Sequence, residues 1–461
     1  MGVIYKSICK YIIIFVIFGS VLQVTGAGDF FTRVANSKFG AYRGGPAKVA
    51  VVASGLFGSI SGSCMANVVG TGTFTIPMMK KTGFDPEFAG AVEASASTGG
   101  QIMPPVMASV AFLIADNLGI TYGQVAFAAL LPALLYYAAI FFQIDFRSVK
   151  LGLKGLSRAE LEDTRELMRH SGYLFLPLII LVVMLATGIT VTKAGLYTIG
   201  ATFVISLFRK ESRITPAKFV SMCCDAAKGG ITVAVACGLV GVMMGTLTLT
   251  GLGFRLSNML VSLSHGSLVL LLILCMITSL IMGMGLPSLA CYVLLATLVA
   301  PALIRMNVEP IAAHLFLFYF GIIGNVTPPV AGAAYCAAGI AQSNPMKTGI
   351  QAFLLSISGF LIPYVFAFNP ALVMVGSIGN TIWTFITAFF GVYCISAAIE
   401  HYLFWKLNIF ETISMFVAAT LMVVPDIPTD FAGFAIFAAV LLMHRLSGKS
   451  LPALCSISES D

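Results

Sequence analysis

The chain has 461 residues, of which 58% are hydrophobic and 10% are charged, and its mean hydropathy is +0.97. A water-facing surface needs far more charge, so this composition excludes soluble globular classes and predicts an all-α polytopic membrane protein. The net charge of +7 lies in short loops, where basic residues set membrane topology, so we expect a lipid bilayer and no nucleic acid as partner.

In the first part of the chain, apolar segments alternate with basic loops. An apolar helix is predicted over roughly 7–25, and a basic loop follows it. Residues 46–80 form an apolar run that is split at Gly58–Gly62. Each half has about 15 residues, or about 22 Å of helix, which is shorter than a hydrocarbon core of about 30 Å. We therefore predict a re-entrant helical hairpin here.

A second interrupted segment is predicted over 86–117. Pro104 and Pro105 remove two backbone donors, and Gly99 and Gly100 precede them, so the helix is expected to unwind there. A spanning helix is predicted over 122–145. The basic loop 146–171 follows, with a surface helix at 156–168, and its charge places it in the cytoplasm.

The rest of the chain contains a second hairpin and a second broken helix, set among ordinary helices. The hairpin is predicted over 267–305 and the broken helix over 310–342. A second cytoplasmic loop is predicted over 209–228. The ordinary helices are predicted near 172–190, 193–208, 230–250, 348–368, 378–403, 408–424 and 430–445.

The chain contains the same segment twice, at a constant offset of 224 residues. Four prolines of the first copy recur in the second, namely Pro77, Pro86, Pro104 and Pro105 as Pro301, Pro310, Pro328 and Pro329. Counting membrane crossings from the loop charges places the two hairpins on opposite sides, so the copies are predicted to be inverted repeats, which are typical of secondary transporters. The predicted division is a scaffold segment 1–45, a first repeat 46–145, a connecting scaffold 146–266, a second repeat 267–345 and C-terminal helices 346–461.

Breaks in membrane helices free main-chain carbonyls and amides, which lipid cannot satisfy. Carbonyls with nearby hydroxyls suit a desolvated Na⁺, and amides at half-helix N-termini suit an anion. Small residues also pack helices closely, but packing alone does not explain their recurrence with prolines at a fixed offset. The predicted Na⁺ ligands are Ser61, Gly62, Ser63, Gly99 and Gly100 in the first copy, and Gly283, Gly285, Ser288, Gly324 and Thr327 in the second.

A solute is expected between the two hairpin tips. The predicted contacts are Asn67, Ser97, Thr98, Gln101 and Asn325. Glu93 is a carboxylate in an apolar segment, which is costly in a membrane and is therefore a candidate for ion coupling. The alternatives are that it lies near a membrane interface, or that it has a structural role as a hydrogen-bond partner of a helix break. The sequence has no HExxH, phosphate-loop or paired CxxC motif, so no enzyme activity and no organic cofactor are expected.

The first repeat resembles the large permease subunit of tripartite ATP-independent periplasmic (TRAP) transporters, of the TAXI-associated type. The segments that carry this resemblance are 43–54, 58–63, 71–77, 88–94 and 97–107, and a looser match continues to about residue 345. The resemblance implies a Na⁺-coupled symporter for small organic acids in a bacterial inner membrane, with an elevator-type transport domain. It implies a periplasmic substrate-binding protein as an obligatory partner, with Na⁺ at the hairpin tips and helix breaks.

Members of this type usually carry further helices ahead of the first helix seen in this chain. We therefore expect either a separate small membrane subunit that supplies them, or a truncated and inactive membrane subunit. A stand-alone cation-coupled carboxylate carrier, without a binding protein, is a further alternative.

Overall fold

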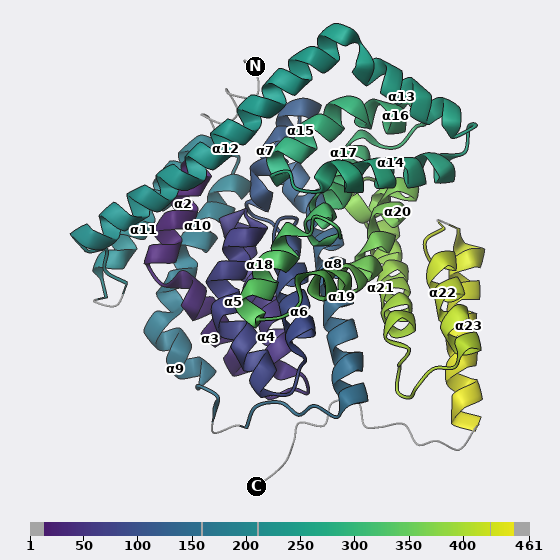
Figure 1. Cartoon of the computed structure of the whole chain (residues 1–461), viewed down its shortest axis with the longest axis horizontal. Coiled ribbons are helices and arrows are strands. Elements are labelled where there is room, and N and C mark those ends of the chain that lie inside the picture. The colour runs from purple at the N-terminus through teal and green to yellow at the C-terminus, as the bar shows by residue number, and fades with distance from the viewer. Residues whose placement is uncertain (1–12, 158–159, 210–211, 425, 447–461) are drawn as a thin grey trace.

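The computed structural model describes residues 13–157, 160–209, 212–424 and 426–446, and these form helices without any sheet (Figure 1). The helices of the first half are α2 (Ile13–Val24), α3 (Ala27–Phe39), α4 (Gly45–Ser61), α5 (Cys64–Lys81), α6 (Pro86–Gly99), α7 (Val110–Leu118), α8 (Tyr122–Leu151), α9 (Thr164–Ser171), α10 (Leu176–Ala186), α11 (Val191–Leu207) and α12 (Pro216–Thr250). Those of the second half are α13 (Leu252–Leu263), α14 (Leu268–Gly283), α15 (Ser288–Leu298), α16 (Ala300–Arg305), α17 (Pro310–Ile323), α18 (Gly332–Ala341), α19 (Pro345–Ile357), α20 (Leu361–Phe368), α21 (Ile378–Glu400), α22 (Ile409–Leu421) and α23 (Ile427–Leu446). Short 3₁₀ turns include η2 (Met107–Ser109), η5 (Gly324–Val326) and η7 (Pro370–Val373).

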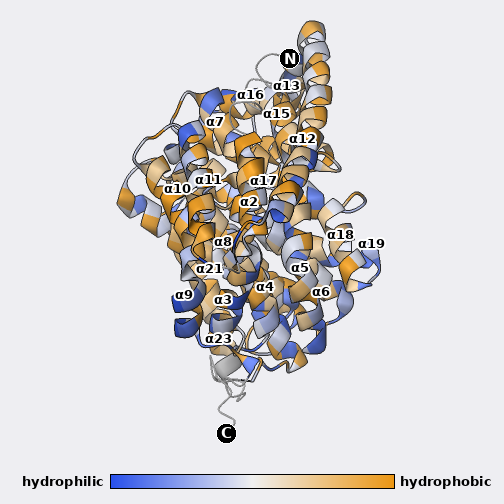
Figure 2. Ribbon diagram, turned by 90° about the vertical axis from the view of Figure 1, so that its left-hand side faces the viewer, coloured by the Kyte–Doolittle hydropathy of each residue, from blue (hydrophilic) through white to orange (hydrophobic). Residues whose placement is uncertain are grey.

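The outer helices carry a largely apolar surface. Among the described residues, five helices are long and apolar enough to cross a bilayer, and α2 with α3 adds a sixth if this pair, bent by 64°, is counted as one span. The side chains of Ile231 and Leu239 on α12 are more than 60% exposed. Hydrophilic residues gather at the end of the molecule where α9 lies (Figure 2). The structure thus confirms an all-helical protein of the multi-pass membrane class.

The first hairpin forms because two residues interrupt an otherwise continuous apolar run. Gly62 ends α4 with a φ of +66°, a conformation that favours glycine. Ser63 then caps α5, since its side chain accepts a hydrogen bond from the amide of Ala66 at 3.4 Å. The break therefore lies at the C-terminal edge of the predicted Gly58–Gly62 interval, and α4 and α5 pack against each other as a helical hairpin.

The second copy repeats these boundaries at the same offset. Helix α15 begins 224 residues after α5 (288 − 64), and α17 begins 224 residues after α6 (310 − 86). Both broken helices unwind where they were predicted to, between α6 and α7 and between α17 and α18. Each unwound segment contains a cis Pro–Pro peptide bond, at Pro104–Pro105 and at Pro328–Pro329.

The two hairpins meet at their tips. The side-chain amide of Gln101 connects them, because it donates hydrogen bonds both to Gly62 at the tip of the first hairpin and to Ser288, the first residue of α15, in the second hairpin. In Figure 1, α4 and α5 occupy the lower half of the molecule and α14 and α15 the upper half. The hairpins thus approach their contact from opposite sides, which is the relative orientation that inverted repeats require.

Several predictions about connecting segments were wrong. The basic segment after the first helix forms α3, where acidic Asp29 lies in the first turn and basic Lys38 in the last, an order that favours a helix. Residues 146–151 continue α8, and the surface helix is α9, which starts later than predicted. Much of the predicted loop 209–228 belongs to α12, and α13 was not predicted. Residues 7–12 of the predicted first helix lie outside the described residues.

Candidate ion and solute site

Gln101 lies at the point where the two hairpin tips meet. It belongs to the unwound segment after α6 and is only 3% exposed. Its Nε2 donates to the main-chain oxygen of Gly62 at 3.3 Å and to Oγ of Ser288 at 2.7 Å. Its Oε1 is buried and has no hydrogen-bond partner among the described residues. A buried acceptor without a partner carries a desolvation cost, so this oxygen is suited to receive a ligand.

Glycines bring the helix breaks against the hairpins at backbone contact. A Cβ on Gly100 would lie 2.5 Å from Cα of Gly58, and a Cβ on Gly324 would lie 2.6 Å from the carbonyl carbon of Gly283. Both distances are shorter than the contacts that real Cβ atoms make, so the residues at these positions must be glycines. The second copy thus reproduces the close approach of the first, and in both copies the start of the helix break lies against the last turn of the first hairpin helix.

The other predicted Na⁺ ligands serve local roles in this structure. The hydroxyl of Ser61 reaches the carbonyl of Ser63 at 3.5 Å, and that of Thr327 donates to Ile323 at 2.8 Å. Gly285 has a φ of +76° at the second tip, as Gly62 has at the first. Gly99 packs against α8, where a Cβ would clash with the ring of Tyr136. Of the ten predicted ligands, Gly62 and Ser288 are therefore the pair that Gln101 joins directly.

The predicted solute contacts fall into two groups. Gln101 and Asn325 lie in the two unwound segments, at equivalent positions of the repeat, and Asn325 is 4% exposed. Asn67, Ser97 and Thr98 are fully buried. Their polar atoms are used within the protein: Asn67 Nδ2 donates to the carbonyl of Ser54 at 2.8 Å, Ser97 to Glu93 at 3.1 Å, and Thr98 to Ala94 at 2.8 Å. The polar atoms of this second group therefore take no part in the contact between the hairpin tips.

Glu93 is fully buried among four hydroxyl groups from three helices. Its Oε1 accepts hydrogen bonds from Ser54 of α4 at 2.7 Å, from Thr71 of α5, and from Ser97 of its own helix α6 at 3.1 Å. Its Oε2 accepts from Thr75 of α5. A buried carboxylate needs such donors, because an isolated charge in a low-dielectric interior is very costly. We call these five residues the Glu93 cluster.

The second copy has no counterpart of the Glu93 cluster. The positions 224 residues after Glu93, Thr71, Thr75 and Ser97 carry Leu317, Leu295, Val299 and Gly321. Leu317, Leu295 and Val299 are fully buried, as their counterparts are. The equivalent of Ser54 is Thr278, whose hydroxyl donates within its own helix to Leu274 at 2.8 Å. The hairpin and broken helix therefore form without a buried carboxylate.

Sequence reasoning found Glu93 but missed three of its partners, Ser54, Thr71 and Thr75. A signal was present, since Asn67, Thr71 and Thr75 follow one another at intervals of four residues in α5 and so share a helix face. Glu93 and Ser97 have the same spacing in α6. Two polar stripes in neighbouring apolar segments are the pattern from which a buried polar contact can be predicted.

Comparison with known proteins assigns a family. Residues 1–381 match the family model described as "Tripartite ATP-independent periplasmic transporter, DctM component". The C4-dicarboxylate TRAP transporter large permease protein DctM of Vibrio cholerae is 24% identical over 391 residues, which cover 78% of this chain and 85% of that protein.

Two longer permeases are also similar. The isethionate TRAP transporter permease protein DctMQ of Oleidesulfovibrio alaskensis is 25% identical over 326 residues, covering 69% of this chain and 50% of that protein. The sialic acid TRAP transporter permease protein SiaT of Haemophilus influenzae is 24% identical over 378 residues, covering 78% and 59%. The chain thus spans between half and three fifths of these two relatives. Because the family model matches most of its length, the chain belongs to the DctM family of TRAP transporter large permeases, which are transport proteins and not enzymes.

Proposed function

We propose that this protein is the membrane permease of a Na⁺-coupled secondary transporter that takes up a small organic acid. The observation that carries this proposal is the buried meeting of two oppositely directed hairpin tips at Gln101. Interrupted helices at the centre of a membrane repeat are the places where transporters bind solutes and ions. On this proposal the hairpins are re-entrant, the tips separate on alternate sides, and the repeats move as an elevator-type transport domain.

The residues at the tips fit an alkali cation. Na⁺ is bound by oxygen atoms, and the tip contact offers the unpartnered Oε1 of Gln101, the hydroxyl of Ser288 and the carbonyl of Gly62. No positively charged side chain takes part in these contacts. When Na⁺ is bound, it would supply the charge that balances an anionic solute, and the amide of Gln101 would turn from bridging the tips to contacting the ligand.

We further propose that Glu93 takes part in ion coupling. The support comes from the comparison of the two copies: the same hairpin is built in the second copy with leucine, valine and glycine at four positions of the Glu93 cluster, and with a threonine that bonds within its own helix at the fifth. A purely structural carboxylate is hard to reconcile with a repeat that forms equally well without it. Glu93 connects α4, α5 and α6 through its hydroxyl partners, so a change in its charge would alter how the hairpin is held against the broken helix.

The proposed partners follow from the family. The relatives described above are named for isethionate, sialic acid and C4-dicarboxylates, which all carry an acid group. We propose that a periplasmic substrate-binding protein, of the TAXI type, delivers a small carboxylate to this permease in a bacterial inner membrane. A separate small membrane subunit would complete the assembly.

The test is uptake into proteoliposomes that contain the full chain and its small membrane subunit. The binding protein, loaded with a radiolabelled carboxylate, is added outside, and an inward Na⁺ gradient is compared with an equal gradient of K⁺. We expect uptake that requires both the binding protein and Na⁺. Uptake that ignores the Na⁺ gradient contradicts the coupling. Uptake of free solute indicates a stand-alone carrier, and no uptake with all partners present indicates an inactive subunit.

A further inference from the structure

Two adjacent tyrosines of α8, Tyr136 and Tyr137, bond to the last turn of α6, directly ahead of the first helix break. The hydroxyl of Tyr136 donates to the main-chain oxygen of Ser95 at 3.0 Å, and that of Tyr137 donates to the main-chain oxygen of Ala96 at 2.9 Å. Tyr136 is only 1% exposed. Two neighbouring side chains of one helix thus hold two successive carbonyls of another.

The two rings fit between elements of both repeats. A Cβ on Gly99 of α6 would lie 2.4 Å from Cε1 of Tyr136, and a Cβ on Gly55 of α4 would lie 3.2 Å from Cε1 of Tyr137. The ring of Tyr136 also packs edge to face on that of Tyr319 of α17, with ring centroids 5.9 Å apart. The tyrosines are therefore held tightly against the first hairpin and both broken helices.

The phenol bonds lie beside carbonyls that the break sets free. The amide of Gly100 still bonds to the oxygen of Ala96 at 3.2 Å, and the amide of Gln101 bonds to that of Thr98 at 3.1 Å. The main-chain oxygen of Ser97 receives neither of these amides, so it is a carbonyl of the last turn that a ligand can use. It lies toward the first hairpin, because a Cβ on Gly100 would lie 3.2 Å from this oxygen and would also clash with α4.

The second copy has an apolar contact where the first has these bonds. The positions 224 residues after Tyr136 and Tyr137 carry Phe360 and Leu361, whose side chains have no hydroxyl. The ring of Phe360 packs edge to face on that of Phe320 near the end of α17, with ring centroids 5.3 Å apart. A broken helix of this repeat therefore forms without phenol donors, and the fold alone does not explain the two hydroxyls.

We propose that Tyr136 and Tyr137 are positioning residues of the first break. They fix the last turn of α6, so that the carbonyl of Ser97 and the side chain of Gln101 are held beside the hairpin tips for Na⁺ and the solute. This inference rests on the proposed function and assigns the rigidity of its site to α8. A site whose ligands are already fixed binds more tightly, because less conformational freedom is lost on binding.

Conservative variants remove the donors and keep the rings. In Tyr137→Phe the oxygen of Ala96 retains its bond from the amide of Gly100, so the acceptor is not left buried without a partner and the fold should be kept. Tyr136→Phe and the double variant extend this change to both phenols. Tyr122→Phe is the matched control on the same helix, because the buried hydroxyl of Tyr122 has no hydrogen-bond partner among the described residues.

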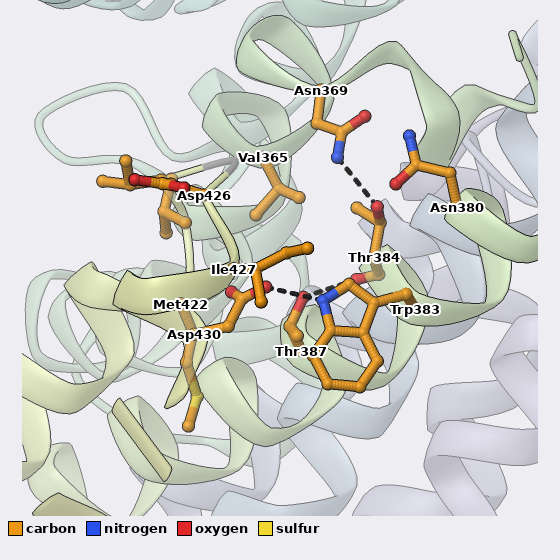
Figure 3. A pocket seen from close by; sticks show the side chains of 12 residues that line it. Val365, Asn369, Asn380, Trp383, Thr384, Thr387, Met422, Asp426, Ile427 and Asp430 are labelled. Atoms are coloured by element: carbon orange, nitrogen blue, oxygen red, sulfur yellow. Dashed lines mark hydrogen bonds between the residues drawn. The ribbon is translucent and has the colours of Figure 1, made fainter. Parts of the chain in front are cut away.

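A second control removes an aromatic donor that holds a helix outside the repeats. The indole of Trp383 on α21 donates to Oδ2 of Asp430 on α23 at 2.7 Å, in a polar pocket among the C-terminal helices (Figure 3). Asp430 is only 5% exposed, so Trp383→Phe deprives a buried carboxylate of a donor and should lower the melting temperature. This variant shows the result of a purely structural loss.

The experiment measures hydrogen–deuterium exchange of the full chain in lipid nanodiscs, while Na⁺ is titrated at constant ionic strength against K⁺. The amides of residues 100–103 report the break directly. In the natural protein we expect Na⁺, but not K⁺, to slow their exchange with a defined midpoint. In the double variant we expect faster exchange without Na⁺ and a midpoint raised by about three- to tenfold, which is the size of effect expected for lost hydrogen bonds. Tyr122→Phe and Trp383→Phe should keep the natural midpoint.

Three results would overturn the inference. If Na⁺ does not slow exchange in the natural protein, the proposed Na⁺ site is refuted and the inference with it. If the natural protein responds but the double variant keeps its midpoint, the role of the tyrosines alone is refuted. If the melting temperature falls while the midpoint stays unchanged, as expected for Trp383→Phe, the tyrosines are only structural. The single variants keep the test readable if the double variant does not fold.

Discussion

The two copies of the repeat share their helix breaks but differ in the chemistry behind them. Both use paired glycines at backbone contact, Gly58 with Gly100 and Gly283 with Gly324, to hold a hairpin against a broken helix. Next to this contact the first copy has a buried glutamate with four hydroxyl partners, whereas the second has leucine, valine and glycine and keeps a hydroxyl only at Thr278, the equivalent of Ser54. The shape of the repeat therefore depends on glycine and proline, while its chemistry is set by a few exchanges between polar and apolar residues.

The largest expected effect comes from filling the shared glycine contacts. Gly100→Leu and Gly324→Leu each place a side chain onto backbone atoms of the facing hairpin, which cannot move without separating hairpin and broken helix. Overpacking of this kind costs about 1–3 kcal/mol or more. We expect both variants to insert into membranes but to lose uptake in proteoliposomes.

Gly123→Leu is the matched control for these variants, because a Cβ on Gly123 meets nothing within 4 Å. It should retain uptake. Normal uptake by Gly100→Leu would refute the assignment of a site to the first contact. A difference between Gly100→Leu and Gly324→Leu would show that the two copies are mechanically unequal.

Glu93→Gln tests the feature that distinguishes the first copy. The amide keeps the size of the side chain, but it cannot carry the charge and it brings a donor against hydroxyls that now donate to Glu93. A mismatched buried hydrogen bond costs about 1–3 kcal/mol. We expect uptake to fall by more than tenfold and its dependence on Na⁺ or on pH to change. A variant with lower thermal stability but unchanged ion dependence would assign Glu93 a structural role.

Replacing the whole Glu93 cluster by the residues of the second copy sharpens this test. The combined variant Ser54→Thr, Thr71→Leu, Thr75→Val, Glu93→Leu and Ser97→Gly removes the carboxylate together with its donors, and the threonine at position 54 can donate within its own helix as Thr278 does in the second copy. We expect this variant to fold and to have a higher melting temperature than Glu93→Gln, closer to that of the natural protein. We also expect it to lack coupled uptake. Retained Na⁺-driven uptake would show that the cluster is dispensable.

The sequence alone predicted the parts of the fold that depend on local signals. Gly62, Pro104 and Pro328 interrupt apolar runs, and interruptions of this kind can be recognised without knowledge of the packing. The helices α3 and the first half of α12 were missed, because basic residues such as Arg33 and Lys218 were assigned to loops when they lie on helix surfaces. Loop charge indicates the side of the membrane, but it does not exclude a helix.

The candidate site was predictable only in outline, for a related reason. Gln101 and Ser288 are 187 residues apart, and no local pattern indicates that they meet. Ser97 was predicted as a solute contact from its nearness to the break in sequence, but the helical turn directs its hydroxyl to Glu93, four residues earlier. Tertiary contacts decided which polar groups lie at the tips and which lie behind them.

The contact of Gln101 with Ser288 is expected to have an intermediate effect. Gln101→Ala and Ser288→Ala each remove one partner, and the double variant should show a coupling of about 1 kcal/mol in the affinity for the transported solute or for Na⁺. Solute binding to the reconstituted permease, measured over the full set of four proteins, gives this value. Strict additivity would mean that the two tips do not act together through this bond.

The smallest effect is expected for Thr98→Val, a change toward Ile322 at the equivalent position of the second copy. The hydroxyl of Thr98 donates to Ala94 within α6, and the side chain is fully buried, so the valine replaces it with little loss of volume. Exchanges of a locally bonded hydroxyl cost about 1 kcal/mol or less. We expect the KM for uptake to stay within about twofold, which corresponds to less than about 0.5 kcal/mol. A rise of tenfold or more in KM with unchanged stability would place Thr98 in contact with the solute. The first copy would then expose Thr98 to the transport path, although in this structure its hydroxyl bonds within its own helix.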